Sequence, residues 1–421
     1  MNTSRDRARE LDARDPLRAF RQQFLFPADE TGEPLIYLCG NSLGLEPRRT
    51  REIVDEELDR WARLGVEGHF EGAAPWFSYH EVLAEPVARI VGATADEVVV
   101  MNSLTTNLHL LMVSFYRPTP QRHRIAIEAG AFPSDRYAVA SQARFHGYDP
   151  DEAVVELAPR DGEVTLRTED VCDWLERHGE DVALLLFGGV NYYSGQAHDM
   201  ERITAAAHEA GGTVGFDLAH AAGNLRLRLH DWDVDFAAWC TYKYLNSGPG
   251  GVGGAFVHER FADDPELPRF AGWWGNAPDT RFEMPERFAA QRGAAGWQLS
   301  NAPILAMAAH RAAVEIFDRA GMDAVREKSL ALTEYLLGLL DEIDSDRLEV
   351  ITPSDPAARG SQLSIRVAHG GRELFAALRD DGVIGDFREP DVIRIAAAPL
   401  YNGFEDVWRF WNVLRENELR R

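Results

Sequence analysis

The stretch TVGFDLAH, residues 213–220, joins the end of an apolar, strand-like run to two polar residues. The apolar run closes with Asp217, and His220 follows three positions later. A carboxylate at the end of a buried strand is costly in free energy unless a partner stabilises its charge. Two partners suit this position: a bound cation, such as the protonated ring nitrogen of a ligand, or the N–H groups of a following helix that Asp217 would cap.

The sequence on both sides of this stretch alternates short apolar runs with helical patterns. We expect strands at 97–101, 124–128, 182–187, 213–217, 236–241 and 254–258, and helices at 107–116, 134–145 and 200–210. Buried strands that alternate with helices indicate an α/β fold with a mainly parallel sheet. Ligands of such folds bind beyond the carboxyl ends of the strands, where Asp217 lies.

Three segments are expected along the chain. Residues 1–60 would hold a polar N-terminal arm and the first helix, whose apolar face recurs through 47–64, and residues 61–310 would form the large ligand-binding domain. From about residue 310 the pattern changes. A helix at 323–340, strands near 348–351 and 362–367 and a last helix near 404–416 predict a smaller C-terminal α+β domain at 311–421.

The composition excludes several kinds of partner. A formal net charge of −24 would repel phosphate backbones and anionic membranes, so we expect neither nucleic acid nor a membrane as a partner. The charged N-terminus lacks the apolar core of a secretion signal, so we expect a cytoplasmic protein. Cys39, Cys172 and Cys240 are widely spaced, which argues against a disulfide framework and a structural zinc site, and no metal is expected.

Only two of the 44 basic residues are lysines, Lys243 and Lys328. Lys243 lies in WCTYKYLNSGPGGVGG, residues 239–254, between an apolar strand and a glycine-rich loop that lets the backbone approach a bulky ligand. Partial desolvation there would favour the neutral, nucleophilic amine. A surface lysine beside a flexible turn is the alternative. Lys328 lies at a polar helix start and needs no special explanation.

Two further segments each join a strand to a helix. In MNSLTTNLHLL, residues 101–111, the backbone N–H groups at Leu104 and Thr105 could bind a phosphate, although Thr105 could equally be only an N-cap. In GAFPSD, residues 130–135, Phe132 could stack on a planar ring and Asp135 could anchor a ring substituent. The alternative for this segment is a core phenylalanine followed by a helix cap.

In this order, the segments resemble the kynureninase family, which has the aspartate-aminotransferase-like fold (fold type I) of the class V aminotransferase-like enzymes. The resemblance runs from about residue 35 to the C-terminus. It is carried by LCGNSLGL, NSLTTNLHLLMVSFY, AFPSDRYA, NYYSGQ, VGFDLAHAAGN, LHDWDVDFAAWCTYKYLNSGPGG, GWWGN, LSNAPI and IRIAAAPLYN.

The resemblance implies pyridoxal 5'-phosphate as the cofactor, with Lys243 as its Schiff-base lysine and Asp217 on the pyridinium nitrogen. The other residues that it assigns to the cofactor are Leu104, Thr105 and Tyr242 at the phosphate, Phe132 on the ring, and Pro133, Ser134, Asp135 and His220 around it. At Gly188 some relatives have a hydroxyl residue, so that side-chain contact cannot exist here.

For the substrate, the resemblance implies that Arg394 holds the carboxylate, with Ser42 nearby. An internal salt bridge from Arg394 to an acidic residue, such as Glu389 or Asp391, is the alternative. The aromatic end of the substrate would meet His69 and Asn301. Trp273 and Asn301 would also reach the site of a neighbouring subunit, which implies a homodimer.

The implied reaction is hydrolytic cleavage of the Cβ–Cγ bond of L-kynurenine to anthranilate and L-alanine in tryptophan catabolism, with 3-hydroxykynurenine as a further possible substrate. Tyr242 is our choice for the general acid and base. A cysteine desulfurase would need a nucleophilic cysteine beyond the lysine, and none follows Cys240. An aminotransferase stays open. Lys243 and Asp217 argue against a protein that only binds the cofactor.

Overall fold

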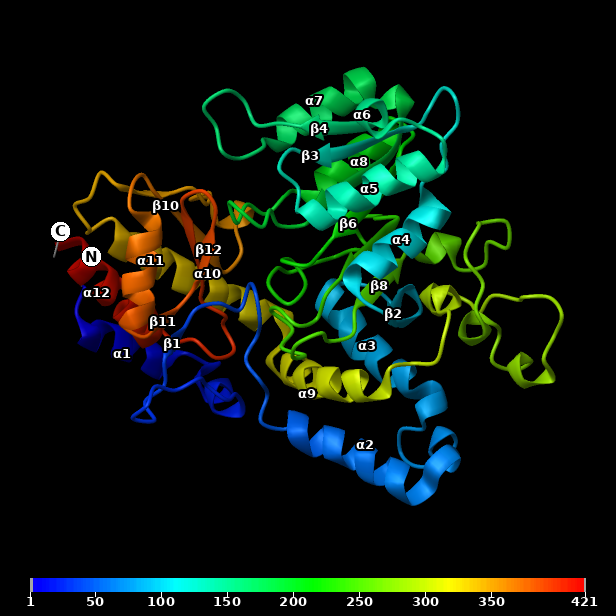
Figure 1. Cartoon of the computed structure of the whole chain (residues 1–421), viewed down its shortest axis with the longest axis horizontal. Helices are drawn as coiled ribbons and strands as arrows, with labels where there is room; N and C mark the ends of the chain where they lie inside the picture. The colour runs from blue at the N-terminus through cyan, green and yellow to red at the C-terminus, as the bar shows by residue number, and fades with distance from the viewer. Residues whose placement is uncertain (1–2, 420–421) are drawn as a thin grey trace.

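The computed structural model describes residues 3–419, and its main body is built on a seven-stranded sheet (Figure 1). The strand order is β2-β8-β7-β6-β5-β3-β4. Strands β3 to β7 pair in parallel, whereas β8 is antiparallel to both of its neighbours, so the predicted mainly parallel sheet is confirmed. The strands are β2 (Val98–Val100), β3 (Arg124–Glu128), β4 (Val154–Leu157), β5 (Val182–Gly188), β6 (Thr213–Asp217), β7 (Phe236–Trp239) and β8 (Gly254–Val257).

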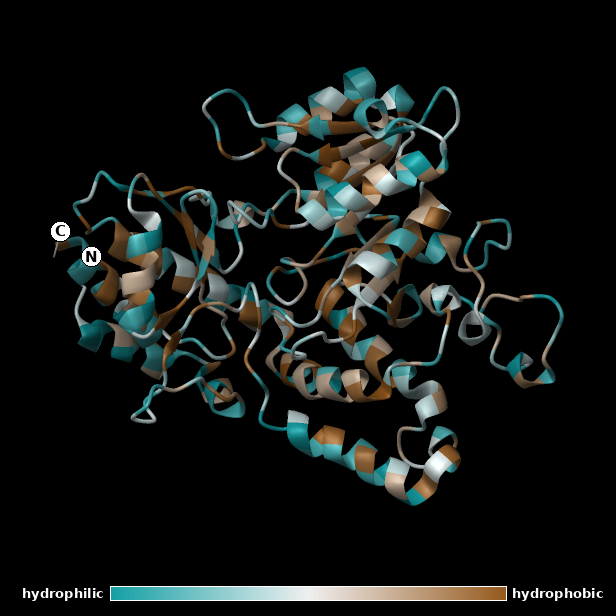
Figure 2. Ribbon diagram, viewed as in Figure 1, coloured by the Kyte–Doolittle hydropathy of each residue, from teal (hydrophilic) through white to brown (hydrophobic). Residues whose placement is uncertain are grey.

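Helices cover both faces of this sheet. Because side chains alternate along a strand, Val98 and Val100 pack in the apolar cluster that includes α3 and α9, whereas Val99 packs in the cluster that includes α4 and α5. Figure 2 shows the strands of the large sheet as largely hydrophobic, as expected for strands buried on both faces. The helices of this body are α2 (Thr50–Leu64), α3 (Tyr79–Val91), α4 (Leu104–Phe115), α5 (Pro133–Phe145), α6 (Pro150–Ala153), α7 (Thr168–His178), α8 (Met200–Glu209) and α9 (Ile304–Ala320).

A second, smaller sheet lies at the other end of the molecule, with antiparallel strands in the order β12-β13-β10-β9. The predicted C-terminal α+β region is therefore confirmed. Its elements are α10 (Met322–Leu340), β9 (Leu348–Val350), β10 (Gln362–Val367), α11 (Gly371–Asp380), β11 (Val383–Ile384), β12 (Asp386–Arg388), β13 (Val392–Ala396) and α12 (Phe404–Leu419).

The beginning of the N-terminal arm packs on this smaller region, whereas Leu17 and Phe24 belong to the apolar cluster of the large sheet. Helix α1 (Arg5–Arg14) lies beside α12, and β1 (Ile36–Tyr37) pairs in parallel with β11 (Figure 1). Ala8 and Ile36 belong to the same apolar cluster as the side chains of α10 and α12. The domain boundaries at 60 and 310 stay predictions, and residues 1–2 and 420–421 lie outside the described chain.

Lys328 differs from its sequence-based description. It is buried inside α10, where its Nζ forms an ion pair with Asp15 Oδ2 at 2.6 Å. A buried ammonium needs such a partner because the loss of hydration would otherwise disfavour its charge. Lys328 therefore ties the arm to α10.

Across residues 3–419, no helix combines the length and the apolar character needed to cross a membrane.

Candidate active site

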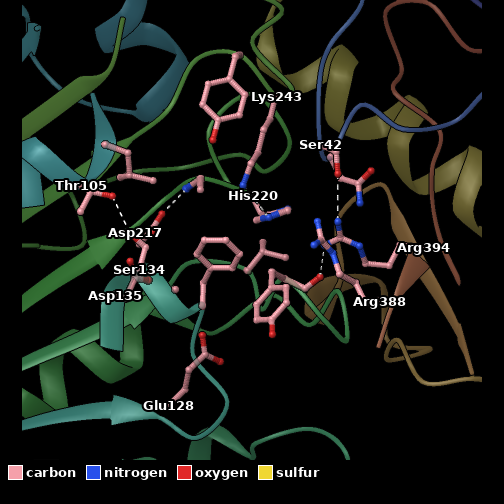
Figure 3. Close-up of a pocket in the computed structure, with 18 of the residues that line it drawn as sticks. Ser42, Thr105, Glu128, Ser134, Asp135, Asp217, His220, Lys243, Arg388 and Arg394 are labelled. Atoms are coloured by element: carbon pink, nitrogen blue, oxygen red, sulfur yellow. Dashed lines mark hydrogen bonds between the residues drawn. The ribbon is translucent and has the colours of Figure 1, made fainter. Parts of the chain in front are cut away.

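A cavity of about 310 Å³ lies where strand ends of the large sheet face the smaller region. Most of the residues predicted from the sequence meet in it (Figure 3). They are Ser42, Leu104, Thr105, Phe132, Ser134, Asp135, Asp217, His220, Tyr242, Lys243 and Arg394. We call Lys243, His220, Asp217 and Asp135 the lysine wall. We call Ser42, Arg388 and Arg394, together with the Asp386 carboxylate that binds all three, the arginine wall.

In the lysine wall, Lys243 and His220 are in contact. Lys243 follows β7 and is half-buried, with its Nζ 3.0 Å from His220 Nε2. Burial, and then the charge of Lys243, hold the pKa of His220 well below its usual range. The amine and the neutral imidazole are therefore within hydrogen-bond distance, and the alternative of a solvent-exposed surface lysine is wrong.

Asp217 and Asp135 form a buried acidic pair beside Lys243. Burial raises the pKa of both carboxyl groups, and the neighbouring Asp217 charge adds to the shift at Asp135. Asp217 Oδ1 accepts the Ala219 N–H at 2.7 Å, but in the described chain no helix lies between β6 and β7, so the helix-capping alternative is wrong. Asp135 Oδ1 is buried and has no partner among the described residues. A bound cation would stabilise this pair in its ionised form.

Two helix N-termini meet at the same end of the cavity. Helix α4 begins at Leu104 with Ser103 as its N-cap, so Thr105 is not the cap. Thr105 Oγ1 lies 2.8 Å from Ser134 Oγ, which joins α4 to the first turn of α5. Pro133 is the first residue of α5 and does not line the cavity. Free backbone N–H groups and hydroxyl groups at two helix starts form a suitable phosphate site.

Two aromatic side chains flank the lysine. Phe132 is 42% exposed, so it is not a core residue, and its ring makes an edge contact with Tyr192 at 5.2 Å between centroids. Lys243 Nζ lies 5.9 Å from the centre of the Phe132 ring and 6.0 Å from that of Tyr242. Burial, and then the nearby Cys240, raise the pKa of Tyr242, so its hydroxyl keeps its proton at neutral pH.

Arg394 dominates the arginine wall. It lies on β13 and is 1% exposed. Its Nη1 donates to the Tyr192 carbonyl at 2.6 Å, and its Nη2 donates to Ser42 Oγ at 3.1 Å and forms an ion pair with Asp386.

The structure thus contains the internal salt bridge that was the alternative for Arg394, but neither of the two acidic residues suggested for it is the partner. Glu389 forms its ion pair with Arg372, and Asp391 Oδ1 accepts from the Tyr193 hydroxyl at 3.0 Å. Asp386 takes their place because it lies directly opposite Arg394 across β12 and β13.

Several lining residues were missed in the sequence, among them Asn41, Glu128, Tyr192 and Arg388. Glu128 ends β3 as Asp217 ends β6, so the same strand-end signal could have found it. Its Oε2 lies 2.9 Å from His198 Nε2 and accepts from Asn191 Nδ2 at 2.9 Å. A Cβ atom at Gly188 would lie 2.8 Å from Glu128 Oε1, so Glu128 takes the room that a side chain at that position would need.

Besides Pro133, three predicted residues do not line the cavity. Trp273 is 41% exposed and Asn301 is also exposed, while His69 makes an edge contact with Trp76 at 5.4 Å between ring centroids. Within one chain these residues lie apart from the lysine wall, so their roles stay predictions.

The residues of the cavity fit pyridoxal 5'-phosphate. Asp135 Oδ1, without a partner in the described chain, is free to accept a hydrogen bond, and a cation such as the pyridinium nitrogen would stabilise Asp217 in its ionised form. Lys243 is placed for covalent attachment, and the starts of α4 and α5 offer a site for the phosphate.

The fold defines the class of protein. The structure matches a cysteine desulfurase from Thermococcus onnurineus with a TM-score of 0.75 and 19% identity, over 92% of this chain and 95% of that one. It also matches a C-DES mutant with glycine covalently linked to its PLP cofactor, with a TM-score of 0.76 and 17% identity, over 94% and 98%. The chain therefore has the aspartate-aminotransferase-like fold type I that was predicted.

Sequence comparisons narrow this class to one family. The model of the kynureninase C-terminal domain matches residues 325–414. A kynureninase from Myxococcus xanthus is 59% identical over 97% of this chain and 96% of its own length, and one from Koribacter versatilis is 57% identical over the same shares. A kynureninase from Nematostella vectensis is 49% identical over 98% and 93%. The chain belongs to the kynureninase family.

Proposed function

We propose that this protein uses pyridoxal 5'-phosphate to hydrolyse the Cβ–Cγ bond of L-kynurenine, which gives anthranilate and L-alanine. One observation carries the proposal: a lysine beside a buried acidic pair faces a buried arginine across a single cavity. The lysine wall suits the cofactor, and the arginine wall suits the carboxylate of an amino acid. When bound, the cofactor supplies an electron sink for the carbon attached to the substrate amine.

The residues of the chain would position the substrate and move protons. Lys243 would take the proton from the substrate α-carbon and give it back to a neighbouring atom. The neutral His220 would orient the Lys243 amine. Arg394 would hold the substrate carboxylate so that the α-carbon faces Lys243. Tyr242, which keeps its proton at neutral pH, is suited to give that proton to a leaving carbon and to recover it from the attacking water.

We also propose that the protein acts as a homodimer, with Trp273 and Asn301 completing the site of the partner. The support is a group of exposed apolar side chains around Trp273, whose ring contacts that of Phe282 at 5.4 Å. These are Phe70, Trp273, Phe282, Met284 and Phe288. Exposed clusters of this kind mark protein interfaces. A cytoplasmic location agrees with three cysteines that form no disulfide.

The deciding experiment is a turnover assay with the cofactor-loaded protein. L-kynurenine should yield anthranilate, detected by its fluorescence, and an equal amount of L-alanine. Lys243→Ala should yield neither product. Formation of a keto acid without anthranilate would show an aminotransferase and would reject the proposal. The ratio of kcat/KM for kynurenine and 3-hydroxykynurenine then defines the preferred substrate.

A further inference from the structure

Asp386 already forms an ion pair with Arg394, the arginine that would bind the substrate carboxylate. Ser42 donates its hydroxyl hydrogen to Asp386 Oδ2 and accepts from Arg394 Nη2, while Arg394 Nη2 also binds Asp386 Oδ2 directly. These three side chains form a closed ring of hydrogen bonds, of which Figure 3 shows the bond between Ser42 and Arg394. Asp386 does not line the cavity itself, but its carboxylate binds a donor of Arg394 that a substrate carboxylate would need.

Arg394 has too few free N–H groups to bind Asp386 and the substrate carboxylate in the same way. A guanidinium offers five N–H groups, and a carboxylate held by two parallel bonds uses Nη2 together with either Nε or Nη1. Both N–H groups of Nη2 are engaged, by Ser42 and by Asp386. Arg394 Nε is buried and has no partner among the described residues. Bidentate binding of the substrate carboxylate therefore requires Asp386 to dissociate from Arg394.

Arg388 gives Asp386 a second partner. Its Nη2 donates to the same Asp386 oxygen at 3.0 Å, and its Nε is buried without a partner among the described residues. Both residues belong to β12, two positions apart, so their side chains leave the strand on the same side. Strand β12 is three residues long and lies at the edge of its sheet, where only β13 holds it. The Asp386 carboxylate can therefore shift a short distance from Arg394 toward Arg388 without breaking the sheet.

The charges favour this exchange. Arg394 and Arg388 share the single carboxylate of Asp386 in the described contacts, which leaves one positive charge in excess. An incoming carboxylate restores the balance, with the substrate on Arg394 and Asp386 on Arg388. Without substrate, Asp386 keeps the buried Arg394 paired, and an unpaired buried charge would be strongly destabilising.

We propose that Asp386 is a placeholder for the substrate carboxylate and that Arg388 receives it when substrate binds. This inference rests on the proposed function, because it requires Arg394 to bind the carboxylate of an amino acid. As placeholder, Asp386 is a specificity-determining residue: a ligand must displace it to bind, so stray carboxylates without further contacts bind weakly.

Asp386→Asn tests the placeholder by removing the competing charge. The cofactor-loaded enzyme is titrated with L-alanine, and the visible absorbance of the bound cofactor reports the Kd. If Asp386 leaves the Arg394 guanidinium unoccupied about a tenth of the time in the parent enzyme, the Kd for L-alanine falls about tenfold in the variant. Binding of kynuramine, which is kynurenine without its carboxylate, does not change.

The matched control is Glu349→Gln on β9 of the same sheet, where an exposed Glu349 pairs with Arg366 at 3.0 Å. This variant should leave both affinities as they are. An unchanged or higher Kd for L-alanine in Asp386→Asn overturns the placeholder. If the asparagine variant does not fold, Asp386→Ser replaces it with the same expected result.

A second pair of variants tests the part of Arg388. Arg388→Gln alone should weaken L-alanine binding, because Asp386 then has only Arg394 to pair with. In the Asp386→Asn background, Arg388→Gln should not affect L-alanine binding, because Arg388 then has no displaced carboxylate to bind. An equal loss in both backgrounds would mean that Arg388 contacts the ligand itself and would overturn the exchange. Failure to cleave kynurenine would reject the proposed function instead, and the alanine titrations would still decide the role of Asp386.

Discussion

The two walls of the cavity are built in different ways. Each residue of the lysine wall lies at or just beyond the end of a strand in the large sheet or at a helix start beside one. The arginine wall joins Ser42, from a turn near the N-terminus, to residues of β12 and β13 near the C-terminus. The first wall is an assembly of local motifs, whereas the second exists only when distant segments pair.

The walls also differ in charge, and the difference indicates the ligand. The lysine wall holds two buried carboxyl groups whose pKa values are raised, so it favours a cationic group. The arginine wall has two guanidinium groups for one carboxylate, so it favours an anion. A cofactor with a pyridinium nitrogen on one side and an amino acid with a free carboxylate on the other satisfy both.

The largest effect should come from Lys243→Ala in the lysine wall. Covalent attachment of the cofactor should be lost, and kcat should fall by about 10²–10⁴-fold or more, because the same amine also moves protons. Borohydride reduction of the parent enzyme, followed by peptide mapping, should place the pyridoxyl group on Lys243. A pyridoxyl group on Lys328 would contradict the assignment of the wall.

Lys328→Ala is the informative counterpart. It should leave cofactor attachment intact but lower the free energy of unfolding by about 3–5 kcal/mol, because Asp15 would be left buried without its partner.

Arg394→Lys should have the next largest effect. Lysine keeps the charge but loses the two parallel N–H bonds. The fall in kcat/KM for kynurenine should therefore correspond to a loss of about 2–4 kcal/mol of transition-state stabilisation. Turnover of kynuramine should change far less, because it has no carboxylate to misplace. A lower unfolding midpoint with an unchanged KM for kynurenine would reduce Arg394 to a structural ion pair.

Asp217→Asn should weaken the lysine wall without destroying it. The neutral amide can still accept the Ala219 N–H but no longer stabilises a pyridinium charge, a loss of about 1.5–3 kcal/mol or roughly ten- to a hundredfold in kcat. Cofactor binding should persist at lower affinity, measured by absorbance after dialysis. Near-normal turnover would mean that Asp217 serves only the turn that follows β6.

Acid should destabilise the protein through residues outside both walls. Burial lowers the pKa of His310 to about 3 and that of His80 to about 4, whereas the unfolded chain binds these protons near pH 6.5. Stability present above pH 6.5 is therefore lost as the pH falls, by about 2 kcal/mol for each histidine at pH 5. The two carboxyl groups of the lysine wall, Asp135 and Asp217, act in the opposite sense, because their raised pKa values favour proton uptake by the folded state.

Urea unfolding at pH 7 and pH 5 measures this loss. His310→Gln should reduce the pH dependence of stability by about 2 kcal/mol, while His369→Gln, at an exposed position, should leave it unchanged. An equal pH dependence in all three proteins would contradict the burial argument.

Much of the lysine wall could be predicted from the sequence because its signals are local. The strands at 124–128 and 213–217 form at the predicted residues, and others end within a few residues of the prediction. An apolar run followed by a polar residue identifies a strand end, and the ends of parallel strands meet at one edge of the sheet. Elements with mixed patterns, such as β4 with its exposed Glu156, were missed because one polar residue interrupts the apolar signal.

The sequence by itself determined the fold class, the place of Lys243 beside a glycine-rich loop and the acidic end of the strand at 213–217, because each depends on residues that are neighbours in the chain. Only the tertiary structure decided the partner of Arg394. Glu389 and Asp391 are closer to it in sequence, but the antiparallel register of β12 and β13 sets Asp386 opposite Arg394 and turns the nearer carboxylates elsewhere. The burial of Lys328 against Asp15 was decided in the same way, since the path of the N-terminal arm over α10 is a property of packing and not of local pattern.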